Sequence, residues 1–159
     1  MKHACRVEVL DTLCFSELQE RYLADPKSGP CPCFEKGQVF EFQRVPERDD
    51  FYHLGRGTRA DGGDFPCGEA WDCISRYVYA ALQGGAIMHG WTNDERVMIS
   101  CCNDGTRPVV FKLERIDSPE TPEEAAWLTA QDFTNSTEDA WLGQRCQAPL
   151  DNTVLSNGA

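Results

Sequence analysis

The sequence contains no apolar run long enough to cross a membrane, because a membrane-spanning helix needs about 20 mostly apolar residues. Residues 1–6 also lack the apolar segment and the small-residue cleavage site of a secretory signal. We therefore expect an intracellular, cytoplasmic protein that does not enter a membrane.

An excess of positive charge is also missing. The 26 acidic side chains outnumber the 15 basic ones, which leaves a net charge of −11. A chain with this charge repels the phosphate backbone of nucleic acids. Residues 116–159 hold eight acidic side chains and one arginine, whereas residues 1–115 hold 18 acidic and 14 basic side chains. We expect no nucleic-acid partner, and we divide the chain into a core domain, residues 1–116, and an acidic helical appendage and tail, residues 117–159.

Motifs for metal or hydrolytic chemistry are missing too. No two cysteines have the two-residue spacing of a zinc ribbon or zinc finger. None of the three histidines stands in a His-Glu-x-x-His or nucleophile-elbow context. Of the three, His89 is the best placed to line a pocket, because it lies in a glycine-flanked loop close to Trp91.

What the sequence does contain is nine cysteines among 159 residues. Intracellular glutathione keeps most thiols reduced, and an odd number cannot be fully paired, so we expect free or metal-bound cysteines. Two interpretations stay open, namely chemistry or metal binding at sulfur and the packing of thiols as small hydrophobic side chains. Six cysteines are clustered and three stand alone: Cys31 and Cys33, Cys67 and Cys73, Cys101 and Cys102, then Cys5, Cys14 and Cys146.

Apolar periodicity and turn residues predict an α+β domain. Ser16 and Gln19 form a capping-box pattern for a short helix whose apolar side chains include Leu18 and Tyr22. Residues 44–66 are polar and rich in glycine, which predicts a long surface loop. The order strand, helix, strand, helix, strand, strand favours a mostly antiparallel sheet packed on helices, followed by a C-terminal helix and tail. The predicted elements are a strand at 5–10, a helix that begins at 16 and closes before 26, a stiff loop at 29–34, a strand at 39–42, a helix at 70–82, strands at 97–102 and 107–113, and a helix at 121–131.

Cys67 lies just before the strongest predicted helix, where free amide groups and the helix dipole favour a thiolate. Trp71 lies on the same side of that helix, whereas Cys73 is rotated well away from Cys67. Cys67 is therefore a candidate nucleophile or metal ligand. The alternative is a thiol in the capping region without special reactivity.

Cys101 and Cys102 are neighbours in a predicted strand, so their side chains point to opposite faces. By alternation Val97, Ile99 and Cys101 share the apolar face. We therefore expect Cys102, beside the polar turn, to be the more accessible thiol.

Asp104 and Arg107 bracket the turn of the predicted hairpin. In one interpretation Asp104 fixes the turn through the nearby backbone and Arg107 lies on the surface. In the other, the two residues form a charge pair that holds a substrate carboxylate or orients Cys102.

Several motifs between residues 4 and 116 form a pattern of cysteine, glycine and tryptophan positions. They are residues 5–10, Gly29-Pro30-Cys31-Pro32 with Phe34 and Gly37, Cys67 with Ala70, Trp71 and Ile74, Gly84-Gly85, Trp91, and the long segment 101–116. This pattern resembles a family of small, mostly bacterial cysteine-containing proteins without an assigned function.

The resemblance implies a set of shared positions but no activity. The chain has Glu69 where the family has a tryptophan, and Cys73 where the family has an aspartate. Residues 44–66 and the region after 116 look like additions to a shorter core, of a kind that often reshapes a pocket. The shared positions are Cys5, Cys31, Cys67, Trp71, Cys101, Cys102, Asp104 and Arg107, and those peculiar to this chain are Cys14, Cys33, Cys73 and Cys146.

Our leading hypothesis is a small enzyme of unknown reaction whose thiols line a pocket for a small-molecule ligand. Cys67 would be the thiolate nucleophile or base, and Asp104 and Arg107 would orient the ligand. The candidate catalytic residues are Cys67, Cys102, Asp104 and Arg107, and the candidate pocket residues are Cys31, Trp71, His89 and Trp91.

Two alternatives belong to other classes. One is a module that binds zinc or copper, with Cys5, Cys31, Cys67 and Cys101 (or Cys102) as soft ligands. The other is an interaction domain that uses the acidic helix at residues 121–131 to dock a basic partner.

Overall fold

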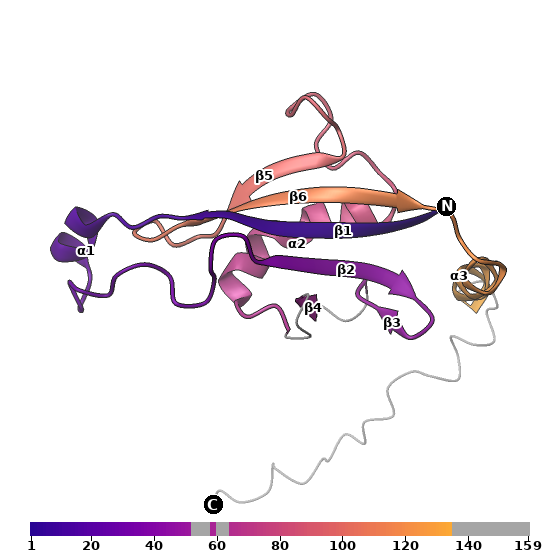
Figure 1. The fold of residues 1–159 in the computed structure, drawn as a ribbon, viewed down its shortest axis with the longest axis horizontal. Helices are drawn as coiled ribbons and strands as arrows, with labels where there is room; N and C mark the ends of the chain where they lie inside the picture. The colour runs from indigo at the N-terminus through magenta and orange to yellow at the C-terminus, as the bar shows by residue number, and fades with distance from the viewer. Residues whose placement is uncertain (52–57, 60–63, 135–159) are drawn as a thin grey trace, which may run out of the picture. The chain divides into compact units, whose positions relative to one another are not determined.

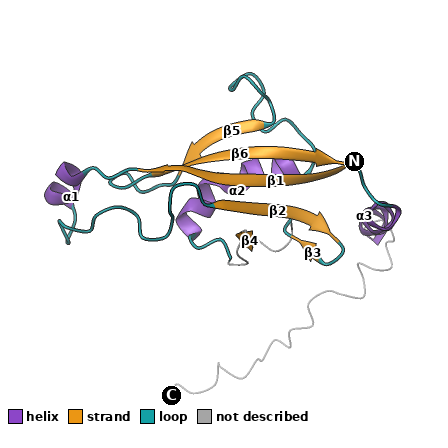
Figure 2. Cartoon of the chain, viewed as in Figure 1, coloured by secondary structure: helices purple, strands orange, loops and turns teal. Residues whose placement is uncertain are grey.

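The computed structural model describes residues 1–51, 58–59 and 64–134. Contacts divide the chain into two units, Met1–Glu120 and Thr121–Ala159, and each is described by itself. Figures 1 and 2 show the predicted strands and helices in the predicted order, with two short strands, β3 and β4, added in the segment predicted to be a loop. The elements of the first unit are β1 (Lys2–Thr12), α1 (Ser16–Tyr22), β2 (Val39–Val45), β3 (Arg48–Asp49), β4 (Thr58–Arg59), α2 (Gly68–Leu82), β5 (Val97–Cys101) and β6 (Val109–Ser118).

The strands form one sheet in the order β3-β2-β1-β6-β5, and β4 also pairs with β2. All neighbours are antiparallel, and the central strand β1 sets the register by pairing Val7 with Phe40 on one side and Leu113 on the other. Helix α2 packs across β1, β2, β5 and β6. The predicted α+β fold with an antiparallel sheet is therefore confirmed.

The core lies between the sheet and α2, because strand side chains of alternate residues point to this face. Cys5, Val7 and Val9 of β1 are at most 1% exposed, as the period of two in the sequence predicts. From α2 the buried residues are spaced at three and four, which is the helical period. The fully buried members of the core include Cys5, Val7, Phe40, Phe42, Ala70, Ile74, Val78, Ala81, Val109, Phe111 and Leu113.

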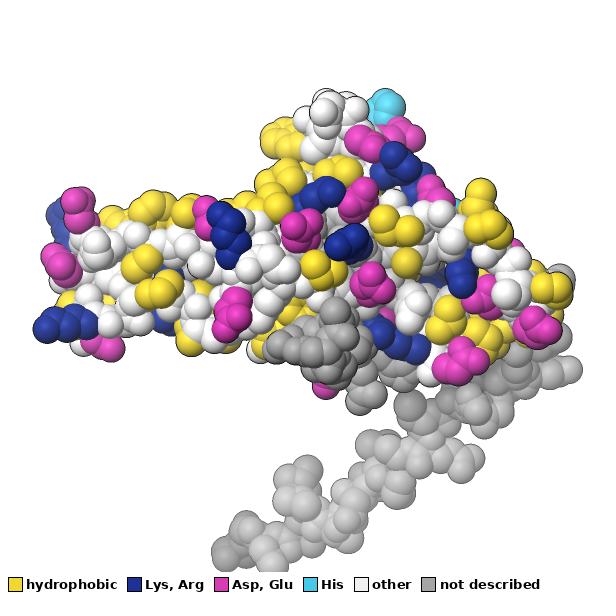
Figure 3. All heavy atoms as spheres, viewed as in Figure 1, with side chains coloured by type: hydrophobic (Ala, Val, Ile, Leu, Met, Phe, Trp, Pro, Cys, Tyr) yellow, Lys and Arg dark blue, Asp and Glu magenta, His cyan; other side chains and the backbone are white. Residues whose placement is uncertain are grey.

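The opposite face of the sheet is the one that Figure 3 presents, with acidic and basic side chains interspersed. Arg6 of β1 pairs with Glu41 on one neighbouring strand and Glu114 on the other. Lys112 and Glu114 of β6 form an ion pair of 2.7 Å. Opposite charges on neighbouring strands suit a face that is in contact with water.

The prediction for the faces of β5 is wrong. Met98 is buried, whereas Ile99 and Cys101 are exposed. Residues that pair directly across an antiparallel ladder point to the same side, and Met98 pairs with the buried Leu113. The partner strand therefore turns Met98, Ser100 and Cys102 towards α2.

Helix α1 begins at Ser16 as predicted, but the capping box does not form. No side chain caps its N-terminus, and Leu18 and Tyr22 are exposed. The side chain of Gln19 is buried instead, where it accepts a hydrogen bond from the amide of Gly29 (3.0 Å) and donates one to its carbonyl (2.9 Å). Gln19 thus ties α1 to the loop that carries Cys31 and Cys33.

The predicted loop at 44–66 is partly regular. Strand β2 runs on to Val45, and β3 pairs back onto it. Asp50 is buried, and its carboxylate accepts a hydrogen bond from the amide of Gln43 (2.8 Å) and pairs with Arg48 (2.7 Å). Residues 52–57 and 60–63 of this segment lie outside the described residues.

In the second unit α3 spans Pro122–Thr134. Thr121 and Glu124 form a capping box at its start, because each side chain bonds the backbone amide of the other residue, at 2.8 and 3.2 Å. The predicted tail, residues 135–159, lies outside the described residues. Among the residues that the structure describes, no helix is both long and apolar enough to cross a membrane.

Candidate functional site

Five chain segments meet at one end of the sheet, at the left in Figure 1. There β1 ends at Thr12, β2 begins at Val39, α2 begins at Gly68, β5 ends at Cys101 and β6 begins at Val109. Antiparallel pairing places the strand ends together, since Glu8 pairs with Val39 and Thr12 with Val109. The connections at this end, residues 31–34, 64–67 and 101–109, are called the thiol end below, because they carry Cys31, Cys33, Cys67, Cys101 and Cys102.

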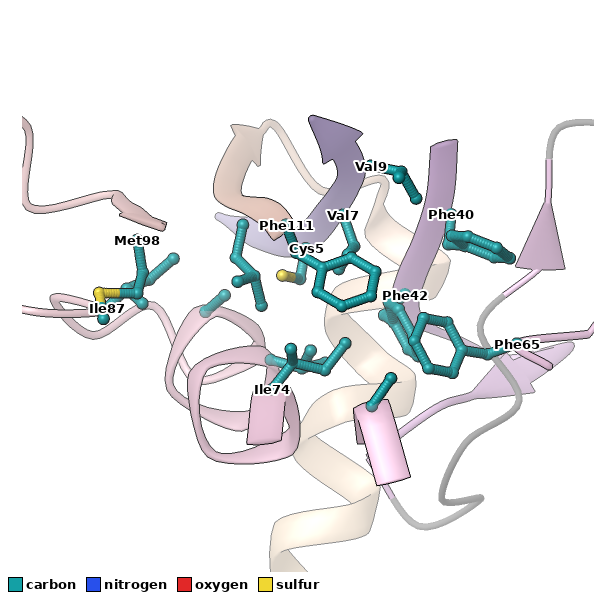
Figure 4. Packing of buried hydrophobic residues seen from close by; sticks show 14 of the residues in the cluster. Cys5, Val7, Val9, Phe40, Phe42, Phe65, Ile74, Ile87, Met98 and Phe111 are labelled. Carbon is teal, nitrogen blue, oxygen red and sulfur yellow. The ribbon is translucent and has the colours of Figure 1, made fainter. Parts of the chain in front are cut away.

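Three aromatic rings fix these connections to one another. The ring centroid of Phe34 lies 5.4 Å from that of Phe65 and 5.2 Å from that of Phe111. All three side chains are buried, and Figure 4 shows Phe65 reaching into the core beside Phe42. Phe34 follows Cys33 directly, and Phe65 precedes Cys67 by two residues. Aromatic packing therefore brings the two thiol-bearing segments together.

Cys31 and Cys33 lie side by side on a bend of the chain at Pro32 and Cys33. Cys31 packs against the core, whereas Cys33 is exposed. The pKa of the Cys33 thiol is raised, mainly because the sulfur is partly buried. The neighbouring thiols of Cys31 and Cys67 raise this pKa further, whereas the positive charge of Arg107 lowers it. Cys33 thus lies within electrostatic range of Cys31, Cys67 and Arg107.

Cys67 is the N-cap residue of α2, with extended backbone angles. Its carbonyl accepts a hydrogen bond from the amide of Trp71 at 3.1 Å, and its thiol makes no capping hydrogen bond. The side chain is half-buried and packs on the core. The first amide groups of a helix have no partner within the helix, so they favour negative charge at this position.

The turn between β5 and β6 is built around Asp104. Its Oδ1 atom accepts hydrogen bonds from the Thr106 amide (2.9 Å), the Thr106 hydroxyl (2.9 Å) and the Arg107 amide (3.1 Å), and its Oδ2 atom accepts one from Arg107 Nε (2.9 Å). Partial burial raises the pKa of Asp104, but these hydrogen bonds outweigh burial and hold it at about 2. Asp104 therefore stays ionised and fixes the turn.

Arg107 has a second set of neighbours. Its guanidinium group lies within electrostatic range of Cys31 and Cys33 as well as Asp104, and these groups raise its pKa, Asp104 most strongly. The side chain of Arg107 is 30% exposed. The pair of Asp104 and Arg107 thus fixes the turn, while the guanidinium group of Arg107 is also close to the thiols and partly exposed to solvent.

Cys102 belongs to a different group of thiols. Its Sγ atom accepts a hydrogen bond from the amide of Val109 at 3.3 Å, and the residue packs against the core. The pKa of Cys73 is raised by burial and then by the thiols of Cys102 and Cys101. The expectation that Cys102 would be the accessible thiol is wrong, since Cys101 is exposed and Cys102 is half-buried.

The predicted pocket residues are divided between two places. Trp71 stacks on Phe42 at 5.3 Å and lies 6.1 Å from Phe65, ring centroid to ring centroid, so it stands next to the thiol end. His89 and Trp91 lie in the loop that precedes β5, and both are exposed. The structure does not bring them to the thiol end, because they lie before Val97 at the start of β5, whereas the thiol end begins at Cys101 where β5 ends.

The four ligands of the metal hypothesis are not brought together either. Cys5 is buried in the middle of the sheet, whereas Cys101 is exposed on the opposite face. Among the described residues, no three side chains of His, Cys, Asp or Glu are arranged to hold a metal ion. The metal-binding module therefore stays a prediction that the described side chains do not support.

Sequence reasoning missed the position of Cys33. Cys33 lies within electrostatic range of Cys31, Cys67 and Arg107, although it is not a shared position of the resemblance. The signal that could have found it is its spacing from Cys31 across a single proline. No protein-family model, curated protein or solved structure matches the chain. Function is therefore inferred from the side chains of the thiol end, and the resemblance stays a prediction.

Proposed function

We propose that the thiol end is a nucleophilic site that reacts with a small electrophilic molecule carrying an anionic group. Cys67 is the attacking residue. The observation that supports this best is that Cys33 lies within electrostatic range both of Cys67, the N-cap residue of α2, and of Arg107. A nucleophilic cysteine needs surroundings that favour its thiolate, and a helix N-terminus with a nearby cation is such a place.

Each neighbour of Cys67 has a role in this proposal. Arg107 attracts the anionic group of the substrate, and Asp104 holds Arg107 in place through the 2.9 Å bond to its Nε atom. Trp71, one turn along the helix from Cys67, supplies an apolar wall for the body of the substrate. Cys31 and Cys33 complete the rim of the site.

The chemical step is addition of sulfur to carbon. The Cys67 thiol first loses its proton to water, and its electron pair forms a bond to the electrophilic carbon. The electrons of the bond that breaks at that carbon move onto the substrate or leave with a departing anion. In this proposal Arg107 stabilises the negative charge that develops on the substrate during this step.

Two alkylating reagents of nearly equal size test the proposal. Iodoacetate is anionic and iodoacetamide is neutral, so the ratio of their rates at one cysteine measures the attraction of that cysteine's surroundings for an anion. A unit charge at about 4 Å in water contributes about 1 kcal/mol, which is about fivefold in rate. We expect the iodoacetate to iodoacetamide ratio at Cys67 to exceed that at the exposed Cys14 by about this factor, and Arg107→Gln to remove the excess.

The matched control is Lys36→Gln, which removes a cation from an exposed side chain paired with Asp11. It leaves the ratio at Cys67 unchanged if the effect belongs to Arg107 and not to net charge. Equal ratios at Cys67 and Cys14 in the unmodified chain contradict the proposal, because the site would then have no preference for an anion. Docking of a basic partner by residues 121–131 stays a prediction.

A further inference from the structure

The segment Cys31-Pro32-Cys33 places two free thiols on either side of one proline. Consecutive Cα atoms are about 3.8 Å apart, so two residues separated by one other are never more than about 7.6 Å apart, and a bend shortens this distance. The chain bends at Pro32 and Cys33, which favours the Cα separations of roughly 4.4–6.8 Å that disulfides require. The two thiols are free, and they are close enough to affect each other's charge.

The bend is held from both sides. On the N-terminal side Gly29 adopts a φ of 71° and makes the two hydrogen bonds to the buried side chain of Gln19. On the C-terminal side Phe34 is 4% exposed and packed between Phe65 and Phe111. Proline fixes the φ of the residue between the thiols. The loop and its contacts with Gln19, Phe65 and Phe111 therefore hold the two thiols next to each other.

We propose that Cys31 and Cys33 form a reversible disulfide when the protein meets a hydroperoxide, which makes this pair a redox-sensitive site. This inference goes beyond the proposed function, and it holds whether or not Cys67 reacts with a substrate. Oxidation removes the thiols of Cys31 and Cys33, which both lie within electrostatic range of Arg107, so it changes the electrostatics and the hydrogen bonding of the thiol end.

Both steps of the oxidation balance with the hydroperoxide as the oxidant. The thiol of the exposed Cys33 first loses its proton to water. The thiolate attacks the terminal peroxide oxygen, an S–O bond forms and the O–O bond breaks, and the departing alkoxide or hydroxide takes up a proton and leaves as an alcohol or water. Cys31 then attacks the sulfur of the Cys33 sulfenic acid, an S–S bond forms, and hydroxide leaves with the proton of Cys31 as water. The two thiols are oxidised and the peroxide is reduced.

The position of the pair also makes the disulfide easy to reduce. A disulfide that closes over one intervening proline forms a small, stiff ring, and one at the surface is open to attack by another thiol. Strained or exposed disulfides are the labile ones. Reduced glutathione therefore restores both thiols.

A single peptide reports the outcome. Trypsin cuts after Lys27 and Lys36, so residues 28–36 carry both cysteines and no others. The full chain is treated with hydrogen peroxide, blocked with iodoacetamide, digested and analysed by mass spectrometry. We expect this peptide to appear unalkylated and lighter by two hydrogen atoms, and to become doubly alkylated when the oxidised protein is first incubated with glutathione.

Two variants complete the experiment. Cys31→Ser is expected to leave Cys33 as a sulfenic acid that dimedone traps, whereas Cys14→Ser is expected to leave the linked peptide unchanged. Two results overturn the proposal. In one, peptide 28–36 is joined to the peptide that carries Cys67; in the other, peptide 28–36 stays doubly alkylated while Cys14 is oxidised. The main measurement needs no variant, so a folding defect in Cys31→Ser does not affect it. The alkylation ratio at Cys67 is measured on reduced protein, so the two proposals can fail separately.

Discussion

The rings of Phe34 and Phe65 lie 5.4 Å apart, centroid to centroid, with 54° between their planes. This contact joins the residue after Cys33 to a residue just before Cys67, and both rings lie in the core. The thiols therefore meet because two aromatic side chains pack, and not because their own spacing in the chain requires it. Loss of this contact should separate the thiols before it unfolds the sheet.

Phe34→Leu tests this relationship. Leucine keeps the position apolar but no longer fills the space between Phe65 and Phe111, and we expect a loss of about 1–2 kcal/mol in the free energy of unfolding by urea. We also expect a short bis-maleimide to join Cys33 to Cys67 with a lower yield. The control is Phe15→Leu at an aromatic residue that is 44% exposed, where both quantities should stay near their original values. An unchanged cross-linking yield in Phe34→Leu would contradict the role of the ring.

Asp104→Asn tests the turn through its dependence on pH. Asp104 has a folded pKa of about 2 against an ordinary value of 3.8, so its ionised form stabilises the fold. That contribution is fully present above pH 3.8 and disappears as the pH falls towards 2. Asparagine keeps one oxygen acceptor but places an amide group against Arg107, which should cost about 1 kcal/mol at pH 7.

The measurement is urea unfolding of both proteins between pH 2 and pH 7, a range that includes the ordinary pKa of 3.8. Other carboxyl groups titrate in the same range, but they are common to both proteins and cancel in the difference. We expect the difference in unfolding free energy to be constant above pH 4 and to shrink below it. A difference that does not depend on pH would mean that the charge of Asp104 contributes nothing to the turn.

Much of the fold can be predicted from the sequence because its periodicity is strong and local. Phe111 and Leu113 alternate with the charged Lys112 and Glu114, and the apolar residues of α2 follow a helical period. Strand β5 is different, since four of its five residues, Val-Met-Ile-Ser-Cys, are apolar. Alternation alone does not select a face for such a strand. The pairing with β6 selects it, and that pairing is not visible in β5 itself.

The thiol end is less predictable for a related reason. The prolines around Cys31 and Cys33 predict a stiff loop, but they do not say against which part of the chain the loop lies. Its place depends on the packing of Phe34 with residues far along the sequence. Cys67 could be found because its setting, the start of a helix, is local. Cys33 could not, because its neighbours Cys67 and Arg107 are brought to it by the tertiary fold.

Gly84→Ala should destabilise the end of α2 that lies away from the thiols. Gly84 has a φ of 72°, which is unfavourable for alanine, and an added Cβ atom would lie 2.4 Å from Nε2 of His3. The carbonyl of Gly84 also accepts a hydrogen bond from Arg115 at 2.8 Å. We expect a loss of more than about 1 kcal/mol in thermal or urea unfolding, since the steric contact adds to the backbone strain.

Gly90→Ala is the matched control for this substitution. Gly90 has the same φ of 72°, but nothing lies within 4 Å of its Cβ position. The difference between the two variants measures the contact with His3, whose Nδ1 is held by Asp117 at 2.7 Å. Equal losses in Gly84→Ala and Gly90→Ala would mean that the ring of His3 moves away at no cost.

Cys5 should react with alkylating reagents only when the whole protein unfolds. It is 0% exposed, and burial raises the pKa of its thiol to about 12 from an ordinary value of 9.0, against a weaker lowering by a backbone hydrogen bond from Glu114. Alkylation needs both access and a thiolate, and the folded protein offers neither near pH 8. We expect the alkylation rate of Cys5 to rise with urea in parallel with the global unfolding constant.

The raised pKa of Cys5 also sets the sign of a pH effect on stability. Below pH 9.0 the thiol is protonated in both the folded and the unfolded chain, so its contribution is fully present. As the pH rises from 9.0 towards 12, the unfolded chain releases the proton while the folded chain keeps it, so stability falls. Cys5→Ala removes the titration, and the stability difference between it and the unmodified chain should shift in this window in favour of the variant.

The exposed Cys14 is the internal reference for the alkylation experiment, since it is alkylated at once in the folded protein. If Cys5 is alkylated as fast as Cys14 without urea, the sheet and α2 open locally around Cys5. Cys5 would then not belong to the stable core.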